Sequence, residues 1–312
     1  MATMSNYISV IGGVNMDIAA NMTDTFVPAD SIPGHVSLSC GGVARNIAHN
    51  LRLLGHNVKF VSLFGGETFG EMCWRECQAV GLDLSLSERL QGQRNGLYLC
   101  VNDLTGDMIA AVADTDIVSR ITPEFLEQRI EAINASATVV ADTNIPMTSL
   151  LYLIDHCTAP LFIDTVSTAK APRVIKALQQ SLSHRLHALK LNLLEAQTVT
   201  RCDNAHDAVA HLLDMGIEQV YVTLGADGVF YGDGSRQEHL PAIPTRVINT
   251  TGAGDAFFAG VVYASLAGLP IRDCALTGLK AAHATLLSLQ TVNEALPSMI
   301  QVPITTTDND KR

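Results

Sequence analysis

Short apolar runs alternate with stretches of helical periodicity along most of the chain. The runs have the length of buried strands, whereas the intervening stretches repeat apolar residues every three or four positions, as helices do. The predicted strands are residues 7–11, 58–63, 138–141, 161–163, 188–191 and 220–224, and the predicted helices are 43–54, 69–79, 148–156 and 205–215. This alternation is typical of an α/β fold with a doubly wound, mainly parallel sheet, helices on both faces and right-handed crossovers.

Two segments interrupt the alternation. Residues 19–40 have no helical period, and residues 96–112 have the pattern of two strands around a turn at 103–106. We interpret both as a small β-sheet lid over the open end of the main sheet; ordinary surface loops are the alternative. The expected division is an α/β domain of residues 1–18, 41–95 and 113–304, a lid of residues 19–40 and 96–112, and a disordered polar tail of residues 305–312. The last part of the α/β domain is predicted to be helical, at residues 254–267 and 270–287.

Composition narrows the possible classes of function. The 312 residues are 47% hydrophobic, enough for a large core, and the formal net charge is −11. Because no run of Lys or Arg occurs, we expect binding of neither nucleic acid nor an anionic membrane. The sequence contains seven cysteines but no C-x-x-C pair, and it has neither the pattern of a signal peptide nor an apolar run long enough to span a membrane. We therefore expect a cytoplasmic protein with reduced thiols.

The strongest chemical signal lies in the stretch Asn-Thr-Thr-Gly-Ala-Gly-Asp-Ala-Phe-Phe-Ala-Gly at residues 249–260. Gly252, Ala253 and Gly254 are small residues at a helix start, where free N–H groups and the helix dipole favour an anion. Asp255 beside such a site suits a general base that takes a proton from a hydroxyl attacking a phosphoryl group. We expect it to be ionised at this position. The alternative is an Asp that only caps the helix.

A second set of residues is typical of a sugar site. Gly41 and Gly42 open a predicted helix with Asn46 one turn later, and Asn15 and Asp17 follow the first predicted strand. The glycines let a ligand approach the backbone, and an Asp can accept hydrogen bonds from two neighbouring hydroxyls. Ligands of open α/β folds bind at this edge of the sheet.

Two further segments have two interpretations each. Asn192 and Glu195 could hold a hydrated Mg²⁺ near phosphates, or they could form a helix capping box. The glycines Gly225 and Gly228 follow Thr223, where a nucleotide could lie against the backbone or a plain hairpin turn could form.

Taken in order, these motifs resemble the ribokinase-like (PfkB) carbohydrate kinase family over residues 7–297. The two glycine-rich signatures, at 41–65 and 249–260, are specific to it. The resemblance implies a ribokinase-like fold with a β lid, and transfer of the γ-phosphoryl group of ATP to a primary hydroxyl. Three runs, 41–55, 140–145 and 166–170, further resemble a branch of the family that acts on a nucleoside.

The resemblance also implies roles for individual residues. Asp255 would be the catalytic base, with the N–H groups of Gly252, Ala253 and Gly254 as an anion hole. The implied substrate-binding residues are Asn15, Asp17, Gly41, Gly42, Asn46 and Asn144, and the implied ATP-binding residues are Lys170, Asn192, Thr223, Gly225, Gly228 and His283. Asn192 and Glu195 would act on Mg²⁺ through water, which favours the metal interpretation over the capping one.

Several points stay open at this level. Asn249 stands where most members of the family have Asp at a monovalent-cation site, so a K⁺ requirement is undecided. Exposed apolar lid residues such as Val36 and Leu38 suit either a homodimer through the lid or a cover over the substrate. The substrate is a nucleoside or sugar, and a phosphorylated sugar would need a basic side chain, for which Arg45 is the obvious candidate. A non-catalytic nucleotide or sugar sensor is the alternative from another class.

Overall fold

A computed structural model describes residues 7–183 and 186–300 of the chain. Its centre is an eight-stranded sheet with the order β14-β13-β12-β11-β10-β9-β1-β4. The strands from β4 to β12 are parallel, and β13 and β14 continue the sheet in antiparallel fashion. Their bounds are β1 Tyr7–Ile11, β4 Asn57–Val61, β9 Thr138–Asp142, β10 Leu161–Asp164, β11 Leu186–Asn192, β12 Ile217–Thr223, β13 Val229–Asp233 and β14 Gln237–Leu240.

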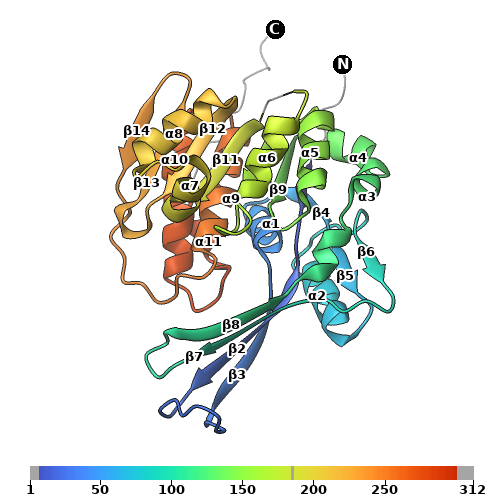
Figure 1. Cartoon of the computed structure of the whole chain (residues 1–312), viewed down its shortest axis with the longest axis vertical. Helices are drawn as coiled ribbons and strands as arrows, with labels where there is room; N and C mark the ends of the chain where they lie inside the picture. Colours follow the sequence, from blue (N-terminus) through green and yellow to red (C-terminus); the bar gives the residue numbers. More distant parts are fainter. Residues whose placement is uncertain (1–6, 184–185, 301–312) are drawn as a thin grey trace.

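Helices cover both faces of this sheet (Figure 1). On one face α1, α9 and α10 pack against Val140 and Phe162, and on the other α5, α6, α7 and α8 pack against Val139 and Ile163. Neighbouring strand residues therefore point into two separate cores, as the pleat of a doubly covered sheet requires. The helices are α1 Val43–Leu53, α2 Thr68–Ala79, α3 Pro123–Glu127, α4 Ile130–Asn134, α5 Met147–His156, α6 Pro172–Gln180, α7 Leu193–Thr200, α8 Ala205–Asp214, α9 Ala253–Leu266, α10 Ile271–Leu286 and α11 Leu296–Met299, with 3₁₀ turns η1 Asp116–Arg120 and η2 Gly225–Asp227.

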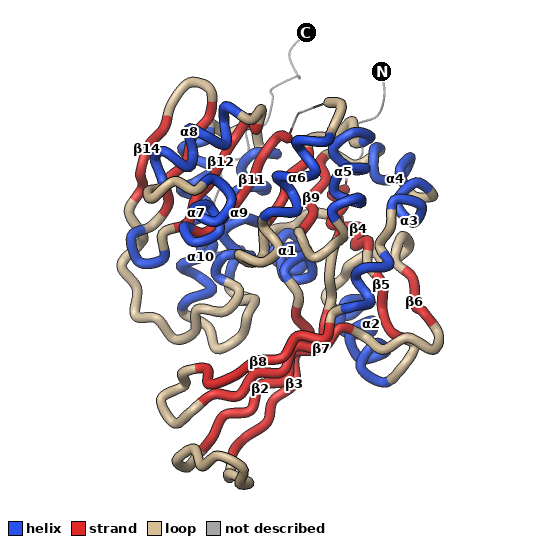
Figure 2. The backbone as a smooth tube through the Cα atoms, in the orientation of Figure 1, coloured by secondary structure: helices blue, strands red, loops and turns tan. Residues whose placement is uncertain are grey.

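A separate four-stranded sheet extends from the α/β body (Figure 2). Its order is β3-β2-β7-β8, with β2 parallel to β7 and the outer pairs antiparallel. The strands are β2 Asn15–Met22, β3 Gly34–Gly41, β7 Gly96–Asn102 and β8 Met108–Asp114, and a small pair, β5 Leu63–Gly65 and β6 Glu88–Leu90, lies beside α2. Strand β3 exposes Val36 and Leu38.

The fold class predicted from the sequence is confirmed, and the differences lie at the ends of elements. Strand β2 begins at Asn15, so the small sheet starts four residues before the expected lid segment and contains both Asn15 and Asp17. Helices α3 and α4 have five residues each, too few to show a helical period. The polar tail predicted at residues 305–312 lies outside the described residues. Across the described ranges, no helix combines the length and apolar character needed to cross a membrane.

Candidate active site

The predicted anion site is the start of α9. Gly252 precedes the helix with a φ of +81°, and a Cβ on it would collide with the carbonyl oxygen of Thr291, so only glycine fits. Within residues 7–183 and 186–300, the N–H groups of Gly252, Gly254 and Asp255 have no protein acceptor, whereas that of Ala253 donates to the carbonyl oxygen of Thr250 at 3.3 Å. Three of these N–H groups are therefore free for an anion, and a fourth is held by one long bond.

Asp255 lies in the first turn of α9 with its side chain buried. Its Oδ2 accepts a hydrogen bond of 2.8 Å from Nδ2 of Asn46, one turn into α1, so the starts of the two helices meet here. Burial and the nearby Asp164 raise the pKa of Asp255 from 3.8 to about 7, although Asn46 and Lys190 oppose the shift. The expectation that Asp255 is ionised at the helix start therefore holds only above about pH 7, because burial raises its pKa.

The predicted sugar-binding residues meet where the small sheet joins the body. Nδ2 of Asn15 donates to Oδ1 of Asp17 along β2. A Cβ on Gly41, at the end of β3, would overlap with Oδ2 of Asp17, and a Cβ on Gly42 would lie 2.5 Å from the carbonyl oxygen of Gly13. Burial is the main cause that raises the pKa of Asp17 to about 7. Both glycines therefore leave room for polar groups that face the same space.

Asp142 organises this space and was missed by sequence reasoning. It ends β9 fully buried, and its carboxylate accepts hydrogen bonds from the N–H of Gly13 (3.3 Å), the N–H of Ala44 (3.0 Å), and both the N–H and Nδ2 of Asn144 (2.9 and 2.8 Å). It thereby joins three segments from distant parts of the sequence. The available signal was its position two residues before Asn144 at the carboxyl end of a predicted strand, where an Asp is usually a turn residue.

Lys170 lies with the substrate residues. Its Nζ donates to Oδ1 of Asn144, and burial lowers its pKa although Asp142 partly offsets this. The resemblance assigns Lys170 to the phosphates of ATP; in this structure its observed partner is instead a predicted substrate-binding residue.

The geometry of Asn192 and Glu195 includes the capping box. Oδ1 of Asn192 accepts from the N–H of Glu195 at 2.9 Å, and Oε2 of Glu195 accepts from the N–H of Asn192 at 2.9 Å. Oε2 also accepts from the hydroxyl of Thr165, and Oε1 accepts from Nδ2 of Asn192 at 2.7 Å. Among the described residues no cluster of three ligating side chains occurs. Asn192 and Glu195 therefore fit an Mg²⁺ ion only indirectly. Water molecules bound to the ion would donate hydrogen bonds to the remaining lone pairs of Glu195, since Mg²⁺ usually keeps several water ligands.

The predicted nucleotide residues lie on the neighbouring strand. Thr223 ends β12 and pairs in register with Asn192 of β11. Gly225 and Gly228 have φ values of +61° and +96°, and the N–H of Leu224 donates to the carbonyl oxygen of Gly228 at 2.8 Å, so a tight turn connects β12 to β13. The hairpin interpretation is thus also correct in geometry.

His283 and Asn249 stabilise the segments before and beyond α9. The ring of His283, on α10, pairs with the hydroxyl of Thr245. Asn249 donates from Nδ2 to the carbonyl oxygen of Leu289 at 3.1 Å and accepts at Oδ1 from the N–H of Thr251 at 3.0 Å. Both polar groups of the Asn249 side chain are therefore bonded to backbone groups.

A buried ion pair adjoins the anion site. Nζ of Lys190, near the end of β11, lies 3.0 Å from Oδ2 of Asp164 at the end of β10. Asp164, Glu195 and Asp255 raise the pKa of Lys190, and burial opposes them. Sequence reasoning assigned no role to either member of this pair.

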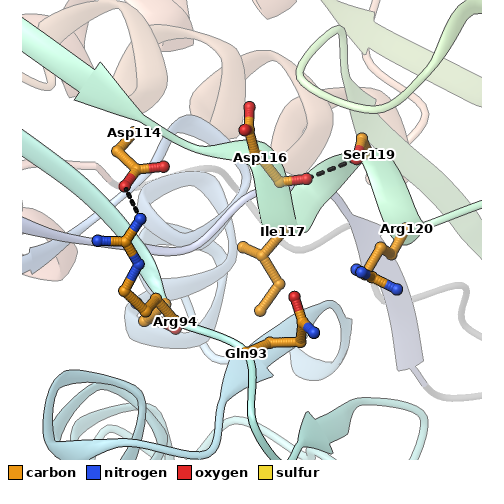
Figure 3. A pocket seen from close by; sticks show the side chains of 8 residues that line it. Gln93, Arg94, Asp114, Asp116, Ile117, Ser119 and Arg120 are labelled. Carbon is orange, nitrogen blue, oxygen red and sulfur yellow. Dashed lines mark hydrogen bonds and ion pairs between the residues drawn. The ribbon is translucent and has the colours of Figure 1, made fainter.

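A surface pocket beside η1 contains none of these residues (Figure 3). Arg94 pairs with Asp114 at 3.4 Å, and the hydroxyl of Ser119 donates to the carbonyl oxygen of Asp116. Since none of the predicted site residues lines this pocket, we assign it no function.

Comparison with known proteins identifies the family of the chain. Residues 5–299 match the pfkB family carbohydrate kinases. The chain is 34% identical over 275 residues to a pseudouridine kinase of Escherichia coli, with 86% of each chain covered, and 26% identical over 300 residues to a guanosine-inosine kinase of Exiguobacterium acetylicum, with 95% of this chain and 98% of that protein covered.

Solved structures show the same fold. A carbohydrate kinase from Agrobacterium tumefaciens has a TM-score of 0.80 and 28% identity, covering 94% of this chain and 96% of that chain. Arabidopsis thaliana ribokinase complexed with ribose and ATP has a TM-score of 0.82 and 18% identity, covering 95% and 99%. The chain therefore belongs to the pfkB family of carbohydrate kinases, which phosphorylate sugars or nucleosides.

Proposed function

We propose that this protein transfers the γ-phosphoryl group of ATP to the 5′-hydroxyl of pseudouridine. The observation that carries the catalytic part is Asp255: a buried carboxylate with a pKa near 7, bonded to Asn46 and placed beside unpaired N–H groups at the start of α9. A base with a pKa near the working pH is ionised often enough to act and basic enough to accept a proton.

The proposed reaction begins with the ribose on Asp17 and Asn46, next to Gly41 and Gly42. The 5′-oxygen forms a bond to the γ-phosphorus while its proton moves to Asp255. The bond from the γ-phosphorus to the bridging oxygen breaks, and its electron pair stays on the β-phosphate of ADP. N–H groups at 252–255 stabilise the phosphoryl oxygens in the transition state. Mg²⁺, held through water by Glu195 and Asn192, would neutralise charge on the ATP phosphates.

The small sheet supports the role of a lid. Its strand β2 carries Asn15 and Asp17, so substrate contact and lid position are mechanically linked. Closure over bound substrate would exclude water and limit hydrolysis of ATP. The exposed Val36 and Leu38 of β3 are available either for this cover or for a second copy of the chain.

The choice of pseudouridine rests on the 34% identical E. coli relative and on the sequence runs 41–55, 140–145 and 166–170. Other nucleosides and ribose are the next candidates, and the guanosine-inosine kinase relative supports the former. A phosphorylated sugar is disfavoured, because Arg45 is buried and already paired with Glu76 at 2.7 Å. A sensor without turnover is disfavoured by the buried base at the anion site.

A substrate panel tests the proposal. Initial rates with MgATP are measured for pseudouridine, uridine, adenosine, ribose and fructose 6-phosphate, and products are identified by mass spectrometry. We expect pseudouridine to give the highest kcat/KM and a 5′-monophosphate. A higher kcat/KM for another member of the panel would reject pseudouridine but retain the kinase, and binding of ATP without turnover of any acceptor would support the sensor.

A further inference from the structure

Lys190 pairs with Asp164 and also lies against the anion site at the start of α9. The side chain is 8% exposed, and its Nζ lies 2.9 Å from the position that a Cβ on Gly254 would occupy. Gly254 is the second residue of α9, and its own N–H has no protein acceptor within the described ranges. The ammonium group therefore forms one wall of the space into which the free N–H groups of Gly252, Gly254 and Asp255 open.

The charges around this space are unbalanced. Asp142, Asp164 and Asp255 are buried carboxylates at the carboxyl edge of the sheet or the start of α9. Lys190 pairs with Asp164, and Lys170 interacts electrostatically with Asp142, so these three carboxylates face two cations. A phosphoryl group that approaches Asp255 brings further negative charge into a site of low dielectric, where like charges repel strongly. The positive charge of Lys190, beside Gly254, would offset this repulsion. A side chain at residue 254 would displace the ammonium group, which gives a further reason for glycine at this position.

We propose that Lys190 is a catalytic residue whose ammonium group contacts the transferring phosphoryl group, while Asp164 positions it. This inference rests on the proposed kinase function. In the step itself the substrate oxygen bonds to the γ-phosphorus, the proton goes to Asp255, and the electron pair of the broken bond stays on ADP. Lys190 takes part without gaining or losing a proton, as a fixed positive charge.

The test compares nucleotides that differ in the γ-phosphoryl group. Lys190→Met removes the ammonium group, and the double variant Lys190→Met/Asp164→Asn also removes the carboxylate that would be left buried without a partner. Lys176→Met, on the exposed side of α6, is the matched control. Affinities for ADP and for the β,γ-imido analogue of ATP, each with Mg²⁺, are measured by calorimetry, and kcat is measured with the best substrate of the panel.

In the double variant we expect the affinity for the ATP analogue to fall at least about tenfold relative to that for ADP, and kcat to fall about 10²–10³-fold, as for the loss of one oxyanion donor. Lys176→Met should match the wild type in both. Equal weakening of ADP and the ATP analogue, or an unchanged kcat, in a folded double variant would overturn the proposal. The affinity ratio involves no acceptor, so it tests Lys190 even if every candidate substrate fails.

Discussion

Replacing Asp255 by Asn should stabilise the protein at alkaline pH while it removes the proposed base. The wild-type carboxylate has a pKa of about 7 in the folded protein, against an ordinary value of 3.8. Its proton is therefore bound more tightly in the folded than in the unfolded chain. The stability that this difference contributes is fully present below pH 3.8 and is lost as the pH rises through about 7. An Asn has no such loss, and its Oδ1 can still accept the hydrogen bond from Asn46.

The size of the effect follows from the two pKa values. Relative to very low pH, the raised pKa of Asp255 lowers the free energy of unfolding of the wild type by about 4 kcal/mol at pH 8. At pH 5 the same effect is only about 1.5–2 kcal/mol. The advantage of Asp255→Asn over the wild type should thus grow by about 2–3 kcal/mol between pH 5 and pH 8. The pKa values of Asp17, Glu76 and Asp142 are also raised, and these three carboxylates occur in both proteins, so the comparison isolates the change at residue 255.

Guanidinium unfolding followed by circular dichroism at pH 5 and pH 8 measures this difference. The matched control is Asp24→Asn, which makes the same substitution at an exposed position. If Asp255→Asn is no more stable than the wild type at pH 8, then Asp255 does not bear the cost of burial that we attribute to it, and its suitability as a base near neutral pH is refuted.

Three further predictions concern the same site. The kcat/KM of the wild type should rise with pH and reach half its maximum near pH 7, because Asp255 must be ionised to accept the proton. A flat profile from pH 5 to 9 would exclude Asp255 as the base. Gly41→Ala should raise the KM for the nucleoside at least about tenfold without changing the KM for ATP, because the added Cβ displaces Asp17. The control Gly234→Ala should change neither KM, because a Cβ there meets no atom within 4 Å. Asp142→Ala should lower the free energy of unfolding by about 3 kcal/mol, as urea titration would show, since two buried and two partly buried hydrogen bonds lose their acceptor; a change below about 1 kcal/mol would contradict this role.

The positions of the chemical groups could be predicted because they follow from the order of strands. Asn144, Asn192 and Thr223 stand at or just after the carboxyl end of an apolar run, and in a parallel sheet those ends share one edge. The helix starts at Gly42 and Gly252 were similarly visible as small residues before apolar periodicity.

The pKa of Asp255 and the contacts of Lys190 and Lys170 could not be predicted in the same way. The pKa of Asp255 depends on its burial and on Asp164, which is distant in sequence and reaches the site only through the pairing of β9, β10 and β11. Lys190 stands two residues before Asn192, yet its neighbour Gly254 becomes apparent only when α9 is packed on the sheet. Lys170 gave no signal that Asn144 would be its partner.

The most direct test of the central claim is the turnover of Asp255→Asn with the best acceptor, together with its affinity for MgATP. Because a general base contributes about 10²–10⁴-fold, we predict that kcat falls by this factor while the Kd for MgATP stays within about threefold of the wild type. The variant must also show native circular dichroism, which excludes loss of folding as the cause. Wild-type turnover in the Asn variant would contradict the account, because proton transfer at residue 255 would then not limit the reaction.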